Sequence, residues 1–196
     1  MKKVIFSAYF LVITIAAALA QTQKGNVLVG ADLMNFGLNF QKGNTQFQLN
    51  VKPKAAWFID DNLALGAEVL AGLNTQKGAT SFNYGVGALA RKYFGAEANN
   101  LTRTTKWFAE GNLGFYGTNL TGTNLPKTST NGIGVGLGPG LAYFLTQNIA
   151  LEALAKYNLT IGLGNSTTNN NLGFGLGFQI CLPGKQVKQL ADNPIK

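Results

Sequence analysis

Residues 131–145 read NGIGVGLGPGLAYFL, and they alternate strictly between two kinds of side chain. The odd positions from Ile133 to Tyr143 are apolar, whereas the even positions from Gly134 to Ala142 carry only glycine or alanine. Successive side chains of a β-strand point to opposite faces of the sheet. The stretch therefore predicts a strand with one apolar face and one nearly bare face.

The same period-two alternation recurs in seven other segments, which are separated by clusters of Asn, Thr, Gly and Lys. An even number of such segments is typical of a closed antiparallel barrel in a membrane. The sequence thus predicts an all-β fold, an eight-stranded antiparallel up-and-down transmembrane β-barrel. The predicted strands lie near Asn26–Phe40, Gln46–Phe58, Leu63–Asn74, Phe82–Phe94, Lys106–Gly117, Gly132–Leu145, Ile149–Ile161 and Leu172–Leu182.

The residues opposite the apolar face indicate which solvent surrounds the barrel. A soluble barrel points its apolar side chains inward and covers its outside with polar ones. Here the face opposite the apolar one is mostly glycine and alanine, with occasional charges. Such small residues suit the interior of an eight-stranded barrel, which is only wide enough for side chains. The apolar face is therefore expected to contact lipid.

The alternation also places four acidic and four basic residues on the inner face. A charge that is removed from water without a partner is costly, so these side chains are expected to pair across strands. Lys92 falls on the outer face, where it can extend toward the membrane surface. The predicted lumen charge network consists of Asp32, Lys52, Lys54, Glu68, Arg91, Glu110, Glu152 and Lys156.

A repeat within the chain brings aromatic residues to one end of the predicted barrel. Residues 53–67 (PKAAWFIDDNLALGA) reappear 86 residues later as residues 139–153 (PGLAYFLTQNIALEA). Tryptophan and tyrosine favour the boundary between membrane and water. A girdle of interfacial aromatic residues is therefore predicted, formed by Trp57, Phe58, Tyr93, Phe94, Trp107, Tyr143 and Phe144.

Three local irregularities are expected in the strands. The apolar face changes phase near Leu33–Asn35, which predicts a β-bulge. Pro53 and Pro139 cannot donate a hydrogen bond to the sheet, so bulges or locally broken pairing are expected at both. With the N-terminus in the periplasm, the aromatic-rich turns are periplasmic. The external loops are then predicted at Gln41–Thr45, Thr75–Ser81, Thr118–Thr130 and Gly162–Asn171.

The first twenty residues have the features of a cleavable signal peptide. Lys2 and Lys3 precede an apolar stretch from Val4 to Ala18, and Ala18-Leu19-Ala20 provides a cleavage pattern of small residues. Its removal reduces the formal charge from +8 to +6, without a basic run that would indicate nucleic-acid binding. The predicted organisation is a signal peptide (1–20), a barrel domain (24–182) and a short polar tail (183–196).

Several kinds of catalytic chemistry are excluded by composition. The chain contains no histidine, which removes Ser-His-Asp and Cys-His catalysis and histidine-containing zinc sites. Cys181 is the single cysteine, expected to be a small buried filler, so no intrachain disulfide can form. The glycines from Gly134 to Gly138 lack the spacing of a nucleotide-binding loop. We expect no catalytic residues, cofactor or metal site.

The chain resembles the small eight-stranded outer-membrane β-barrel family of OmpA/OmpX type in Gram-negative bacteria. The resemblance is carried by Pro53–Gly66, Ala90–Phe94 and Pro139–Leu145. Gly175, Phe178 and Ile180 also resemble the last-strand signal that the barrel-assembly machinery reads. The resemblance implies an outer-membrane location, surrounding lipid, and that machinery as a partner during biogenesis.

The function that follows is a structural or surface-interaction role through the external loops, with an unidentified external ligand. The barrel is expected to be a monomer. Two alternatives stay open from the sequence: a narrow pore for small solutes, and a soluble secreted, lipocalin-like ligand-binding barrel. A lumen filled with charges and side chains argues against the pore.

Overall fold

The computed structural model describes residues 22–41, 44–94, 105–123, 125–163 and 168–184. The predicted signal peptide and most of the predicted C-terminal tail lie outside these residues. No helix among the described residues is long and apolar enough to cross a bilayer.

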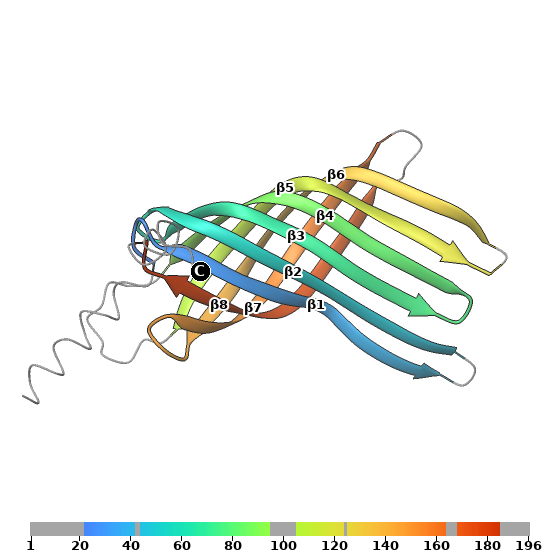
Figure 1. Cartoon of the computed structure of the whole chain (residues 1–196), viewed down its shortest axis with the longest axis horizontal. Helices are drawn as coiled ribbons and strands as arrows, with labels where there is room; N and C mark the ends of the chain where they lie inside the picture. The colour runs from blue at the N-terminus through green and yellow to red at the C-terminus, as the bar shows by residue number, and fades with distance from the viewer. Residues whose placement is uncertain (1–21, 42–43, 95–104, 124, 164–167, 185–196) are drawn as a thin grey trace, which may run out of the picture.

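The described chain forms eight antiparallel strands that close into a barrel in sequence order, with β8 paired to β1 (Figure 1). Long strands with strict alternation and glycine-rich inner faces produce this closure, because each strand can pair on both sides while its apolar residues stay outside. The strands are β1 (Val27–Gln41), β2 (Asn44–Asp60), β3 (Leu63–Gln76), β4 (Ala79–Phe94), β5 (Thr105–Gly122), β6 (Leu125–Phe144), β7 (Ile149–Gly162) and β8 (Asn169–Leu182).

The two faces of the barrel confirm the predicted inversion. Leu137 and Leu176 point outward and are 66% and 70% exposed, whereas Glu110 and Lys156 point inward and are fully buried. Large apolar side chains cover the outside of every strand from β1 to β8. A soluble lipocalin-like barrel would show the reverse arrangement, so this alternative is wrong. The apolar outer face of the barrel is the surface that contacts lipid.

We call the end where Val27 pairs with Leu182 the terminal end, and the opposite end the hairpin end. The hairpin end differs from the prediction, because the expected loop Thr118–Thr130 is mostly strand. Thr118 pairs with Thr130, and pairing continues to Gly122 and Leu125. Threonine is β-branched and favours strands, which accounts for the extension. The long hairpins project to the right in Figure 1.

The bulge predicted in the first strand is confirmed. The register between β1 and β2 shifts between Met34 and Gly37. Asn35 has a positive φ of 53°, a conformation that asparagine tolerates better than most residues. The bulge lets Met34 point inward and Phe36 outward.

Locally broken pairing is confirmed at both prolines, without a bulge. Between β2 and β3 the recorded pairs pass from Val51–Ala71 to Lys54–Glu68, and between β6 and β7 they skip residues 138 and 139. Pro53 and Pro139 remain opposite partners on their other sides, in β1 and β5. A proline lacks only the donor toward one neighbour, so the register is kept.

The seam between β1 and β8 closes only part of the barrel. Their pairing covers Val27 to Met34 against Gly175 to Leu182, although β1 continues to Gln41 and β8 begins at Asn169. Beyond Met34 the two strands diverge, as Figure 1 shows. The hairpin end is therefore wider than the terminal end.

Candidate functional site

The centre of the lumen is occupied by the guanidinium group of Arg91, a fully buried side chain on β4. Its Nη1 lies 2.6 Å from Oε1 of Glu152, and its Nη2 lies 3.1 Å from Oε2 of the same carboxylate. Its Nε also donates to Oε2 of Glu110 at 2.9 Å. One cation thus joins two carboxylates from β5 and β7.

Two lysines extend this arrangement to further carboxylates. Lys54 lies 2.8 Å from Asp32 and 2.7 Å from Glu152. Lys156 lies 2.6 Å from Glu110 and 3.5 Å from Glu68. Both lysine side chains are completely buried. Lys54 also lies 3.7 Å from Glu110, so Lys54 bridges three carboxylates and Lys156 two, without contact with water.

All eight charges assigned to the inner face lie in one continuous series of ion pairs, which we call the ion chain. Lys52 ends the series, 3.1 Å from Glu68. Four carboxylates and four cations cancel, as a buried cluster requires. Neither β6 nor β8 contributes a residue to these ion pairs in the described structure. The order of contacts is Asp32, Lys54, Glu152, Arg91, Glu110, Lys156, Glu68 and Lys52.

Inner glycines provide the room that these large side chains need. A Cβ atom on Gly138 would lie only 2.6 Å from the Cα atom of Lys156, and one on Gly140 would meet the ring of Phe108. On β8, a Cβ on Gly177 would meet the carboxylate of Asp32. The bare face of residues 131–145 is therefore the surface against which the lumen side chains pack.

An aromatic layer closes the lumen between the ion chain and the terminal end. Phe58, Tyr93, Phe108 and Phe144 are all buried there. The ring centroid of Tyr93 lies 6.0 Å from that of Phe58 and 5.6 Å from that of Phe108. The guanidinium carbon of Arg91 lies 4.0 Å from the Phe108 centroid, within the range of a cation–π contact.

The predicted aromatic girdle is wrong for three of its seven members. Phe58, Tyr93 and Phe144 point into the lumen, because adjacent residues of a strand face opposite sides. The girdle members that are exposed on the outer face are Trp57, Phe94, Trp107 and Tyr143.

A short segment before β1 covers the terminal end. Thr22 is buried and its Oγ1 donates to Oδ1 of Asn62 at 2.6 Å. Nζ of Lys106 donates to the same hydroxyl at 2.9 Å, and the backbone N–H of Asn62 donates to the Thr22 carbonyl at 2.7 Å. The segment is thereby tied to both the β2–β3 turn and β5.

The residues of the proposed assembly signal and Cys181 all lie on β8. Phe178 is exposed on the outer face and Ile180 is half-buried. Gly175 is buried, and a Cβ there would lie 2.9 Å from Cγ of Met34. Cys181 is a buried free thiol at the terminal end.

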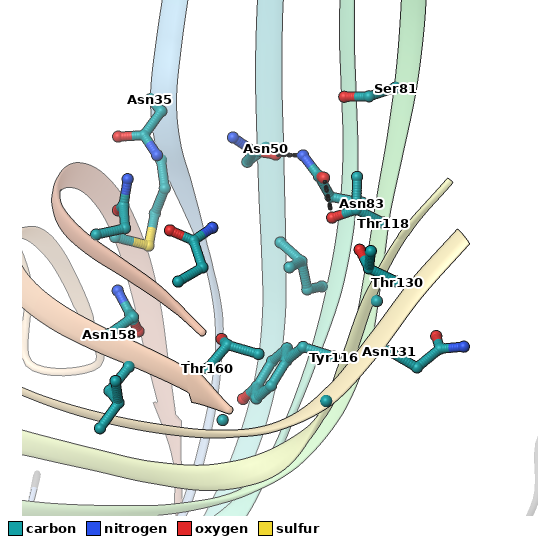
Figure 2. A pocket seen from close by; sticks show the side chains of 18 of the residues that line it. Asn35, Asn50, Ser81, Asn83, Tyr116, Thr118, Thr130, Asn131, Asn158 and Thr160 are labelled. Atoms are coloured by element: carbon teal, nitrogen blue, oxygen red, sulfur yellow. Dashed lines mark hydrogen bonds between the residues drawn. The ribbon is translucent and has the colours of Figure 1, made fainter. Parts of the chain in front are cut away.

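The hairpin end contains a cavity of about 440 Å³ that sequence reasoning did not find. Tyr116 and Lys52 lie in its lining, together with several Thr residues and one Ser (Figure 2). The inward parity of Asn50, Asn112 and Asn158 in the sequence is the signal that could have indicated it. We call this cavity the asparagine cup after the residues Asn35, Asn50, Asn74, Asn83, Asn112, Asn131, Asn158, Asn169 and Asn171.

Several solved structures match this fold at low sequence identity. Neisserial surface protein A is 18% identical with a TM-score of 0.56, and the match covers 82% of this chain and 97% of that one. The N-terminal β-barrel domain of Pseudomonas aeruginosa OprF is 16% identical with a TM-score of 0.50, covering 81% and 98%. The outer membrane enzyme PagL also matches, at 14% identity and a TM-score of 0.41, over 79% and 98%.

Sequence comparison identifies the family. No curated protein sequence matches the chain. The model of the outer membrane protein beta-barrel domain matches residues 6–179, which is most of the sequence. This match agrees with the closed eight-stranded barrel and its apolar outer face. The chain belongs to the outer membrane protein beta-barrel domain family and is an integral protein of the outer membrane.

Proposed function

We propose that this barrel is a non-conducting, non-enzymatic surface platform that presents its hairpin end to the cell exterior. The observation that carries the proposal is the filled lumen. The buried ion chain occupies its centre, and the aromatic layer and the Thr22 segment lie between that chain and the terminal end. At the hairpin end the described residues leave open space, in the asparagine cup.

The orientation is supported by the unequal ends of the barrel. Bacterial outer-membrane barrels have short periplasmic turns and longer external hairpins. Here two of the three terminal-end connections are short, two residues between β2 and β3 and four between β6 and β7, while the third spans residues 95–104; β5 and β6, by contrast, extend far at the hairpin end. The hairpin end is therefore the external end in this proposal, and the terminal end faces the periplasm.

Cysteine labelling on intact cells tests the orientation. Two variants in a Cys181→Ser background place a thiol in turns at opposite ends, Thr123→Cys at the hairpin end and Asp61→Cys at the terminal end. A membrane-impermeant maleimide is expected to label Thr123→Cys on intact cells and Asp61→Cys only after lysis. Labelling in the reverse order would overturn the orientation.

Conductance in planar bilayers tests the filled lumen. The purified barrel is expected to insert without producing stable current steps, because buried ion pairs and aromatic rings occupy the path between its ends. Heat-modifiable gel mobility of the same sample establishes that the inserted protein is folded. Reproducible, ohmic steps from the folded protein would favour the narrow pore instead.

We further propose that the barrel is monomeric and that the barrel-assembly machinery reads its last strand. Phe178 is presented on the outer face of β8, and the apolar outer surface is complete without a second copy, which supports both parts. Phe178→Ala is expected to slow membrane assembly, while Phe174→Ala, farther from the strand end, leaves it near the wild-type rate. Sedimentation in detergent tests the monomer.

A further inference from the structure

One wall of the asparagine cup already satisfies its own hydrogen bonds. Nδ2 of Asn83 donates to Oδ1 of Asn50 at 3.3 Å, and Oγ1 of Thr118 donates to Oδ1 of Asn83 at 2.8 Å (Figure 2). Oδ1 of Asn131 accepts from the hydroxyl of Tyr84 at 2.6 Å. These contacts fix the wall formed by β2, β4, β5 and β6.

The floor of the cup, by contrast, contains an acceptor that is buried and unpaired. Asn112 is only 6% exposed, and its Nδ2 donates to the hydroxyl of Tyr116 at 2.6 Å. Within the described part of the chain, its Oδ1 receives no hydrogen bond. Oδ1 of Asn158 lies near Oδ1 of Asn112, because a Cβ atom placed on Gly136 would clash with both oxygens. A buried acceptor without a donor costs about 1–3 kcal/mol.

More unpaired amides lie higher in the cup. The buried Oδ1 of Asn74 also receives no hydrogen bond in the described structure. The side-chain amides of Asn35, Asn169 and Asn171, which line the side formed by β1 and β8, also have no hydrogen-bond partner among the described residues, and Asn169 and Asn171 are exposed. Figure 2 shows Asn35 and Asn158 on the side of the cup opposite Asn83. The cup thus contains amide donors and acceptors that are free to form hydrogen bonds with a polar ligand.

The charges around the cup indicate that this occupant is neutral. Lys52 is the charged member of the lining, and its Nζ is already paired with Glu68 at 3.1 Å. An anionic ligand would find no free cation there, and the unpaired amide oxygens would repel it. A cation would find no carboxylate in the lining, and an apolar ligand would leave the buried acceptors unpaired.

We infer that the asparagine cup binds an uncharged sugar. Hydroxyl groups both donate and accept, so a hexose can supply donors to Asn112 and Asn158 and acceptors to the amide groups above them. The volume of about 440 Å³ falls within the range of about 300–1,000 Å³ that is usual for small-molecule sites. Access from outside the cell rests on the proposed orientation, whereas binding by the purified barrel does not.

Side-chain amide signals of the barrel labelled with ¹⁵N-asparagine provide a direct test. The folded protein in detergent is titrated with glucose, galactose, mannose, maltose and lactose, and separately with glucuronate and glucose 6-phosphate. At least one neutral sugar is expected to shift the cup asparagines and leave Asn119 and Asn148, which lie outside the cup, unchanged. Absence of shifts with every neutral sugar, or stronger shifts with the charged ones, would overturn the inference.

Matched variants locate the binding. Asn158→Leu and Asn112→Leu are each expected to weaken the sugar that binds best by about tenfold. Asn119→Leu removes an asparagine from the same end of the barrel, outside the cup, and is expected to leave the affinity unchanged. Heat-modifiable mobility verifies that each variant is folded. If Asn112→Leu does not fold, Asn158→Leu still tests the site, because Asn158 is only half-buried. Equal weakening by all three variants would contradict the site.

Comparing the free sugar with the same sugar at the end of a longer glycan separates two sources of ligand. Binding of both supports a cup open to surface glycans, and binding of the free sugar alone restricts the site to small solutes. Failure of both while the labelling test succeeds would reject the sugar site and leave the proposed surface platform intact.

Discussion

Arg91 on β4 and Glu152 on β7 form a two-point ion pair across the lumen, with an Nη1–Oε1 distance of 2.6 Å and an Nη2–Oε2 distance of 3.1 Å. These strands are not neighbours in the barrel, so the pair connects separate parts of the wall. Both side chains are buried, and the pair therefore acts as an internal brace; removing either member leaves the ion chain with one unbalanced buried charge.

Arg91→Met tests this brace. It leaves the buried carboxylates of Glu110 and Glu152 short of a cation and is expected to lower the free energy of unfolding by about 3–5 kcal/mol. Urea unfolding in detergent, followed by tryptophan fluorescence, measures the change. Lys92→Met alters the next residue, which is on the outer face, and is expected to change stability by less than about 0.5 kcal/mol. Equal effects of the two variants would show that the brace contributes little.

Leu176→Arg tests the direction of the apolar face. Leu176 is 70% exposed on the outside, and a charge placed there near the middle of the bilayer is expected to cost about 2–4 kcal/mol. Folding into lipid vesicles, assayed by heat-modifiable mobility, measures the cost. Leu163→Arg, at the hairpin end, is the matched control and is expected to fold normally. A harmless Leu176→Arg would mean that this face does not contact lipid.

Gly138→Ala tests the role of the inner glycines. The new Cβ would lie 2.6 Å from Cα of Lys156, so the strands must move apart, at an expected cost of about 1–3 kcal/mol. Gly111→Ala is the control, because its Cβ would find its nearest neighbour at an ordinary 3.6 Å. Urea midpoints of the two variants are compared. A loss for Gly111→Ala as large as that for Gly138→Ala would refute the crowding argument.

Lys106→Met tests the cover at the terminal end. It removes the donor to Oγ1 of Thr22 and is expected to expose Lys24 to trypsin, with cleavage several-fold faster than in the wild type. Mass spectrometry of the shortened product gives the rate. Lys77→Met, at the hairpin end, is expected to leave the rate unchanged. An unaltered rate in Lys106→Met would show that the hydrogen bond does not hold the segment.

The architecture could be predicted from sequence because alternation with a period of two determines both the strand and its facing. The bulge near Asn35 was also visible, since it disturbs that alternation locally, and the broken pairing at Pro53 could be predicted because proline has no N–H to donate. The length of the β5–β6 hairpin could not, because Thr and Asn are common in loops and strands alike. The residues near the tip of this hairpin, from Thr118 to Gly122 and from Leu125 to Thr130, are paired in the structure.

The contacts in the lumen were less accessible to sequence reasoning. Glu152 and Lys156 lie on the same face of β7, yet they join different partners, Arg91 and Glu110. Which charges meet depends on the stagger of the strands and on the reach of long side chains, neither of which alternation determines. The inward position of Tyr93 could have been predicted, because it is adjacent to the outward Phe94.

The position of Glu152 and Lys156 on β7 has a consequence for biogenesis. Without this strand the ion chain divides into two parts: Lys52 with Glu68, and a group in which Lys54 joins Asp32 to Glu110 while Arg91 keeps only Glu110. The remaining charges still cancel, but an open sheet would expose these ion pairs to hydrocarbon, which is strongly unfavourable. Burial of the ion chain and closure of the cylinder are therefore coupled, and we expect insertion into the bilayer to follow the arrival of the penultimate strand.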